Sequence, residues 1–354
     1  MRSTHLSRFV ILLVAMAVAS GPLWAYDRIE TFEFEDIQSI HVKTVCGGLE
    51  ILPGEKSQFV VVVENRLDDP KNFKRRVETS RGRLLIDEDF LGRSVHGGTQ
   101  WTIYVPKSAK LQSVEFSTAS GGFTLDQVDA DFIETDIASG SVDINSVHAQ
   151  ELDLSTASGS IEIEDCQVDK IDAESASGSV QARNVKAGKL ELSTASGDVS
   201  VHQCEAKRVK ASSASGEVRV SSTDGSEVDL SSASGSVRME DCRVDESAEM
   251  SCASGDVQAR LSRLPADLLH ASTASGDVLL EVADFGENFT MTKRADRGRI
   301  KCPFEYSHQE TIRLNRGDDY LADRYLVQRG KEGPEVELST ASGTIRVDTD
   351  TKGR

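Results

Sequence analysis

Apolar and polar residues alternate along most of the chain in short runs. Around residue 157, for example, Leu152 and Leu154 precede a small-residue stretch, and Ile161 and Ile163 follow it, with mostly polar residues in between. A period of two is typical of strands that bury one face. After residue 25 no stretch shows the 3.6-residue rhythm of an amphipathic helix. The pattern therefore predicts an all-β chain built from short strands.

The pattern is also an internal repeat, centred on Ser-Thr-Ala-Ser-Gly or a close variant. Its glycine recurs every 19 residues from Gly121 to Gly235, and the next two steps are 20 and 21 residues. A strand pair this small cannot bury its own apolar face, but stacked copies can bury it together. The repeat glycines are Gly121, Gly140, Gly159, Gly178, Gly197, Gly216, Gly235, Gly255, Gly276 and Gly343.

Stacking of these copies predicts a single-chain parallel β-helix, a solenoid with coils of about 19 residues. Each strand would pair with the same strand one coil on, about 4.8 Å away. The general crossover preference favours a right-handed helix, and a left-handed helix with triangular coils is the competing model. At a corner that recurs in every coil, small residues tolerate crowding and glycine adopts backbone angles that other residues avoid. Ser and Thr can pass hydrogen bonds from coil to coil.

Composition shifts divide the chain into five segments. Arg2 and Arg8 precede the apolar run 9–19, which is too short to span a bilayer, and Leu23-Trp24-Ala25 resembles a cleavage site. The expected segments are a signal peptide at 1–25, irregular N-terminal β coils and a cap at 26–111, regular repeats at 112–283, an irregular insertion that caps the open end at 284–335, and a terminal coil and tail at 336–354.

Degenerate copies of the repeat occur outside the regular region. Residues 40–51 fit the whole template, whereas residues 81–86 and 297–302 fit its second half. The exported chain is acidic, because loss of Arg2 and Arg8 takes the formal charge from −18 to −20. A nucleic-acid partner is disfavoured, since phosphate binding needs a basic face. No later apolar run is long enough to cross a membrane, and we expect a periplasmic or extracellular protein.

The template V-x-L-S-T-A-S-G-x-V-x-V, together with WTIYVPKSAKL, LPADLLHASTASGDV and the closing ELSTASGTIRV, resembles the bacterial β-strand-repeat family known as putative adhesins. The resemblance spans roughly residues 36–348 and concerns a domain of otherwise unknown function. It implies an exported β-helix of the cell envelope with a structural or binding role, whose ligand is an envelope polymer or a protein. It transfers no catalytic or cofactor-binding residue, so no enzyme activity is expected.

The residue chemistry gives little support to catalysis. The chain has no G-x-S-x-G elbow, no phosphate loop and no dinucleotide fingerprint, and its seven histidines are scattered. The alternative is a polysaccharide lyase or hydrolase on the same scaffold. Such enzymes generally carry aromatic sugar platforms and clustered acids, whereas the regular coils have no Trp and few Tyr. Two or three converging acids beside aromatic rings would favour the enzyme.

Six cysteines in an exported chain would ordinarily suggest disulfides. Cys166, Cys204 and Cys242 lie 38 residues apart, in alternate coils. Two coils correspond to about 9.6 Å, beyond the ~7 Å Cα limit of a disulfide. Cys252 falls in the Thr position of the template, Cys46 in its Ser position and Cys302 at an inward position. We therefore predict mostly buried thiols that act as small hydrophobes.

An acidic stripe follows the outward position six residues before the corner glycine. In five consecutive copies this position is Glu or Asp, starting at Glu115. Oxygen ligands on a repeating edge suit a hard cation, calcium above all, or a basic partner, and a solvated face that keeps the protein soluble is the plainer interpretation. The expected cation-binding residues are Glu134, Asp153, Asp172 and Glu191.

Overall fold

The chain is an all-β parallel β-helix of the kind that the repeat predicts. The computed structural model describes residues 28–67, 73–90, 96–295, 298–316, 318–330 and 333–349; the expected signal peptide lies outside them. Every element in these ranges is a strand, so no helix capable of crossing a membrane occurs there. The chain divides into two compact units, Met1–Thr156 and Ala157–Arg354, and each contains one part of sheet A and one part of sheet B.

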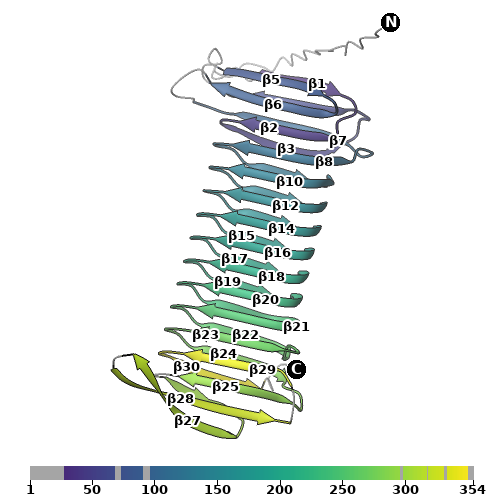
Figure 1. Cartoon of the computed structure of the whole chain (residues 1–354). Coiled ribbons are helices and arrows are strands. Elements are labelled where there is room, and N and C mark those ends of the chain that lie inside the picture. Colours follow the sequence, from purple (N-terminus) through teal and green to yellow (C-terminus); the bar gives the residue numbers. More distant parts are fainter. Residues whose placement is uncertain are drawn as a thin grey trace, which may run out of the picture. The chain divides into compact units, whose positions relative to one another are not determined.

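In the first unit both sheets run from parallel strands into antiparallel ones (Figure 1). Across sheet A the order is β11 (Val142–Asn145), β9 (Phe123–Asp126), β3 (Gly47–Gly54), β7 (Thr99–Pro106), β4 (Phe59–Asn65) and β1 (Arg28–Phe34). Across sheet B it is β12 (His148–Thr156), β10 (Ala130–Ile137), β8 (Leu111–Thr118), β2 (Ser39–Thr44), β6 (Arg83–Phe90) and β5 (Phe73–Ser80). The antiparallel strands cap the parallel stack.

The coil formed by β2 and β3 lies between two coils that follow it in the sequence. Ile40 on β2 pairs with Val114 on one side and with Leu84 on the other. The whole-template fit of residues 40–51 is therefore confirmed. The second-half assignment of residues 81–86 is wrong, because β6 pairs with the first strand of the template. Period-two spacing alone could not distinguish the two halves, which share the same alternation.

The second unit contains the longer series of parallel strands (Figure 1). Across sheet A the order is β13 (Ile161–Glu164), β15 (Val180–Arg183), β17 (Val199–His202), β19 (Val218–Ser221), β21 (Val237–Cys252), β22 (Val257–Arg263), β24 (Val278–Asp284), β30 (Thr344–Thr349) and β26 (Arg299–Lys301). Across sheet B it is β14 (Gln167–Ser175), β16 (Lys186–Thr194), β18 (Glu205–Ser213), β20 (Asp224–Ser232), β21, β23 (Leu268–Thr273), β29 (Glu335–Thr340), β25 (Phe289–Ala295), β28 (Asp318–Arg329) and β27 (His308–Arg316).

The closing repeat of the sequence, β29 and β30, lies inside this series. On one side it pairs with β23 and β24, and on the other with β25 and β26. Residues 297–302 do fit the second half of the template, because Ile300 pairs with Ile345. Segment 284–335 thus adds a further coil and then two antiparallel strands, β28 and β27.

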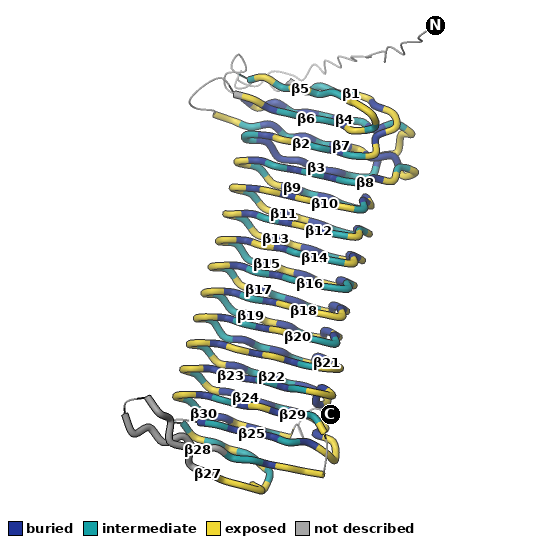
Figure 2. Tube along the Cα trace, viewed as in Figure 1, coloured by how far each residue is buried: buried dark blue, intermediate teal, exposed yellow. Residues whose placement is uncertain are grey.

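Buried residues recur at the same places in successive coils (Figure 2), and their side chains form the core. In a typical coil of the second unit, Leu190 and Leu192 on one strand and Val199 and Val201 on the next are buried. A third column sits seven residues after the corner glycine, where Val185 occupies the place taken by cysteine in neighbouring coils. These are the positions that the alternation predicts, and the third contact is confirmed.

Two corners separate the strands of each coil. At the first, a Cβ atom on Gly178 would lie 1.8 Å from the carbonyl oxygen of Gly159, so the repeat glycine is required by close approach of successive coils. At the second, six residues after that glycine, non-glycine residues adopt a left-handed conformation, for example Asn184 at φ 51°. Asn and Asp tolerate this conformation better than most residues. The second corner was not predicted from the sequence.

Candidate functional site: a groove beside a basic patch

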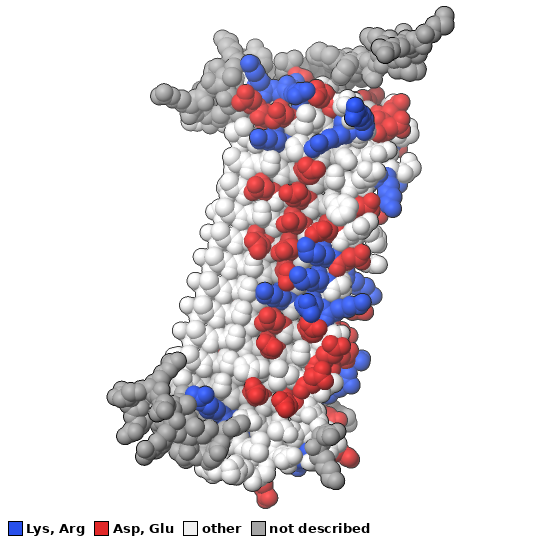
Figure 3. All heavy atoms as spheres, viewed as in Figure 1, with Lys and Arg blue, Asp and Glu red and all other residues white. Residues whose placement is uncertain are grey.

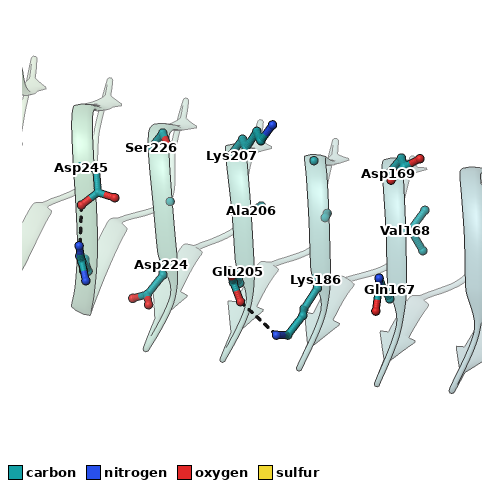
Figure 4. Close-up of a pocket in the computed structure, with 14 residues that line it drawn as sticks. Gln167, Val168, Asp169, Lys186, Glu205, Ala206, Lys207, Asp224, Ser226 and Asp245 are labelled. Atoms are coloured by element: carbon teal, nitrogen blue, oxygen red, sulfur yellow. Dashed lines mark hydrogen bonds and ion pairs between the residues drawn. The ribbon is translucent and has the colours of Figure 1, made fainter.

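A groove of about 570 Å³ crosses five neighbouring strands of sheet B in the second unit, at the first residues of β14, β16, β18 and β20 and at the middle of β21 (Figure 4). Its floor is one column of the sheet, in which Val168, Ala187, Ala206 and Gly225 are successive register partners. The column returns to a large side chain at Val244. The middle strands carry Ala and Gly in this column, where β14 and β21 carry Val.

Outward side chains on either side of this column form two rims (Figure 4). One rim is Gln167, Lys186, Glu205, Asp224 and Arg243. The other is Asp169, Gly188, Lys207, Ser226 and Asp245. The Lys186 ammonium lies 3.3 Å from the Glu205 carboxylate, and Asp245 accepts hydrogen bonds from Arg243 and Arg263 at 3.1 and 2.6 Å. The rims therefore offer both donors and acceptors along the whole groove.

The backbone below the groove is already paired. The register ladders β14–β16, β16–β18 and β18–β20 run through the lining residues. A peptide cannot add to the sheet at this face by strand pairing, because that mode needs an unpaired edge. Recognition here depends on side chains.

A basic patch adjoins the groove. We define it as Lys186, Lys189, Lys207, Arg208 and Lys210, which lie on β16 and β18. The same two strands carry two carboxylates, Glu191 and Glu205, so this surface is locally positive in a chain of formal charge −18. Figure 3 shows Lys and Arg gathered here, between acidic side chains of the adjoining strands. Glu205 pairs with Lys186, whereas no ion pair is described for Lys207.

Two of the acids of the groove, Glu205 and Asp245, are paired with basic side chains. A glycoside hydrolase needs one carboxyl group whose pKa is raised so that it can donate a proton. Hydrogen bonding from Arg243, together with Arg263, instead holds the pKa of Asp245 below its ordinary value. Glu205 lies next to Asp224 in register but is paired with Lys186. None of the described lining residues is aromatic. The groove thus offers ion-paired carboxylates and polar side chains to a ligand.

The acidic stripe is present at the outward position, in two parts. In the first unit Glu134 pairs in register with Glu115 on one side and Asp153 on the other. In the second unit Asp172 pairs with Glu191. His41 lies 2.7 Å from Glu115, so this acid has a basic neighbour.

The stripe residues do not converge. A hydrogen bond from Lys189, whose ammonium lies 2.8 Å from Glu191, holds the pKa of Glu191 below its ordinary value, and Lys210 is the next register partner of Glu191. Among the described residues, no group of three or more His, Cys, Asp or Glu is placed to hold a metal ion. Each carboxylate comes from a separate strand, which spaces the ligands by the ladder distance of about 4.8 Å. Calcium binding at Glu134, Asp153, Asp172 and Glu191 remains a hypothesis.

None of the six cysteines, all of which the structure describes, forms a disulfide, as predicted. Cys166, Cys204, Cys242 and Cys252 are buried, whereas Cys46 and Cys302 are half-buried. Burial raises the pKa of Cys242 to about 11. Cys252 takes the place of a corner hydroxyl, because its sulfur contacts the Gly235 carbonyl at 2.9 Å and the Gly255 amide at 2.8 Å.

Sequence reasoning missed the groove and the patch. The groove follows the column nine residues after the corner glycine, in which the residues change from Val to Ala, Ala and Gly between Val168 and Val244. It is visible only once the coils are aligned column by column. The net charge of the chain did not indicate the patch, because the five basic residues on two strands are outnumbered by acidic residues elsewhere in the chain.

The fold and this surface define the class: a repeat β-helix with a structural or binding role. The chain belongs to the Toastrack DUF4097 family, whose model matches residues 37–174 and again residues 165–319. The resemblance to a β-strand-repeat family of unknown function is thereby confirmed.

Several solved structures match the chain at low identity and with TM-scores below 0.5. A Bacteroides fragilis protein described as a putative adhesin is 17% identical, with a TM-score of 0.44, over 60% of this chain and 95% of that one. A Parabacteroides distasonis protein with the same description is 12% identical, with a TM-score of 0.36, over 92% and 98%. Another protein from that organism, described as a putative lipid binding protein, is 13% identical, with a TM-score of 0.35, over 92% and 98%. No curated protein sequence matches the chain.

Proposed function

We propose that this protein is an exported, non-catalytic binding module of the bacterial envelope that holds an extended acidic polysaccharide in its groove. The observation that carries the proposal is the adjacency of the groove to the basic patch, with Lys186 and Lys207 belonging to both. A groove open along five strands fits a linear polymer better than a compact ligand. The rims carry four carboxylates and three cations, so it is the basic patch beside the groove that favours a polymer with negative charge.

The spacing of the strands supports a polysaccharide. Equivalent side chains recur about every 4.8 Å along the groove, which is close to the rise of one sugar in an extended β-linked chain. Successive sugars would therefore meet successive copies of the same rim positions. Hydroxyl and carboxylate groups of the sugars match the mixed donors and acceptors of the rims.

Export and the lack of catalysis belong to the same proposal. The leader-like segment at 1–25 supports export. The ion-paired state of Glu205 and Asp245 supports binding without cleavage. The polysaccharide lyase or hydrolase alternative predicts shorter products after prolonged incubation with a polymer, which chromatography of the polymer would reveal.

Binding of an oligomannuronate, a β-linked chain of uronic acids, to the purified mature chain tests the proposal by calorimetry. Lys207→Glu reverses a charge on the rim, and we expect about tenfold weaker binding, or ~1.4 kcal/mol. Lys110→Glu is the matched control, because it makes the same charge change at an exposed residue of the first unit. Equal affinity of all three proteins, or equal loss in both variants, would contradict a site at the groove.

A further inference from the structure

One lysine stands in an apolar column of the second unit. Lys293 on β25 is the register partner of Leu338 on β29, and the column continues through Ala271, Met250 and Leu230. These side chains are buried, and Lys293 itself has 0% of its surface exposed. Phe289, Met291 and Ala295 share its inward face. A charged amine is unfavourable in such a column, because burial of a charged group costs several kcal/mol of folding free energy.

Among the described residues, no hydrogen bond of good geometry reaches the amine of Lys293. It lies 4.8 Å from the centre of the Tyr306 ring. Burial lowers the pKa of Lys293, and the neighbouring Cys302 thiol acts in the opposite direction. Burial therefore favours the neutral amine, which is a nucleophile.

Cys302 is the residue directly after β26, which ends at Lys301. It forms no disulfide and is half-buried. Lys293 and Cys302 thus place a buried amine and a half-buried thiol in a single coil, formed by β25 and β26, and the thiol is near enough to affect the pKa of the amine.

We propose that Lys293 and Cys302 form a peroxide-driven covalent link, a sulfenamide, that joins β25 to the end of β26. In the first step the Cys302 sulfur attacks hydrogen peroxide, the O–O bond breaks, and a sulfenic acid and one water result. In the second step the Lys293 nitrogen attacks that sulfur. The S–N bond forms, the S–O bond breaks, and the departing hydroxide takes a proton from nitrogen as the second water.

The complete reaction balances as Cys-SH + Lys-NH₂ + H₂O₂ → Cys-S–NH-Lys + 2 H₂O. Sulfur loses two electrons and peroxide gains them. Two equivalents of an external thiol reverse the link: the Cys302 thiol and the Lys293 amine are restored, and the two external thiols are oxidised to a disulfide. The link would covalently join the two strands of the coil that pairs with the closing repeat, β29 and β30.

Peptide mass spectrometry of the folded mature chain after treatment with hydrogen peroxide tests the link. We expect a peptide containing Lys293 joined to one containing Cys302, lighter by two hydrogens than the sum of the two, and restored by dithiothreitol. Lys293→Met and Cys302→Ser should each abolish it. Met is a suitable replacement because Met250 occupies the same column.

Trapping of the sulfenic acid with dimedone distinguishes the link from ordinary oxidation. Dimedone labelling at Cys302 should be several-fold higher in Lys293→Met than in the wild type, since the competing amine is gone. Cys46, which is also half-buried, is the control thiol whose labelling should not change. Equal labelling of Cys302 in both proteins, a sulfinic acid without the joined peptide, or equal joining in urea would overturn the proposal.

Discussion

The hydroxyl of Thr194 donates a hydrogen bond of 2.8 Å to the carbonyl oxygen of Gly178, which lies one coil earlier. The same hydroxyl accepts a hydrogen bond of 3.2 Å from the amide of Gly197 in its own coil. Ser213 and Ser232 repeat the arrangement with the glycines before and after them. The Ser-Thr-Ala-Ser-Gly repeat therefore links coils through one hydroxyl, as the sequence predicted.

Replacement of that hydroxyl tests its contribution. Thr194→Val keeps the shape of the side chain but leaves the Gly197 amide and the Gly178 carbonyl without this partner. We expect the free energy of unfolding to fall by about 1–3 kcal/mol. Thr194→Ser retains the hydroxyl, so its free energy of unfolding should fall by much less. Urea unfolding of both variants measures the difference, and equal losses would show that the hydroxyl contributes nothing specific.

The corner glycine is needed because coils approach each other closely. Gly178→Ala would place a Cβ atom 1.8 Å from the Gly159 carbonyl oxygen, so the coils must separate. We expect a loss of about 1–3 kcal/mol, as for other overpacked sites. Gly286→Ala is the comparison, since its φ is +70° and nothing lies within 4 Å of the added atom, which leaves the backbone cost of about 1 kcal/mol. A smaller loss at Gly178 than at Gly286 would contradict the close approach.

Glu88 makes stability depend on pH. Thr99 and Trp101 donate hydrogen bonds of 2.6 and 2.7 Å to its carboxylate, yet burial raises the pKa of Glu88 above its ordinary value of 4.5. The folded protein therefore binds this proton more tightly than the unfolded chain does. The stability that the group contributes is fully present below the unfolded pKa and is lost as pH rises through the folded pKa.

Glu88→Gln removes this proton exchange. Between about pH 4 and pH 7 the unfolding free energy of the wild type should fall relative to that of the variant. Chemical unfolding of both proteins at several pH values measures the difference. A difference that stays constant, or that changes in the opposite direction, would show that Glu88 does not titrate in this range.

Calcium binding at the acidic stripe has a direct test. Five acids at one outward position repel one another, and any salt screens that repulsion. If the stripe is a solvated face, calcium chloride and sodium chloride of equal ionic strength should raise the melting temperature equally. An additional rise with millimolar calcium, abolished by Asp153→Asn, Asp172→Asn and Glu191→Gln together, would instead establish a cation site.

The sequence was sufficient to predict the coils, but it was insufficient to predict the order in which they stack. Alternation placed Leu192 and Val201 in the core, because every coil repeats the same environment. It could not show that β2 lies between β6 and β8, since equivalent strands of different coils are interchangeable by pattern. The groove and Lys293 escaped notice for a related reason. Each is a departure from its column, and columns are known only when strand register is known.

The dependence of affinity on ligand length tests the proposed function most directly. Five strands line the groove, at about 4.8 Å per strand. Affinity for oligomannuronates should rise with each added sugar up to about five and then level off, and it should weaken with salt. Cello-oligosaccharides, which have the same kind of extended β-linked backbone without the carboxylates, should bind much more weakly. Affinity that is independent of length, or equal for the acidic and neutral series, would contradict a groove that holds an extended acidic polysaccharide.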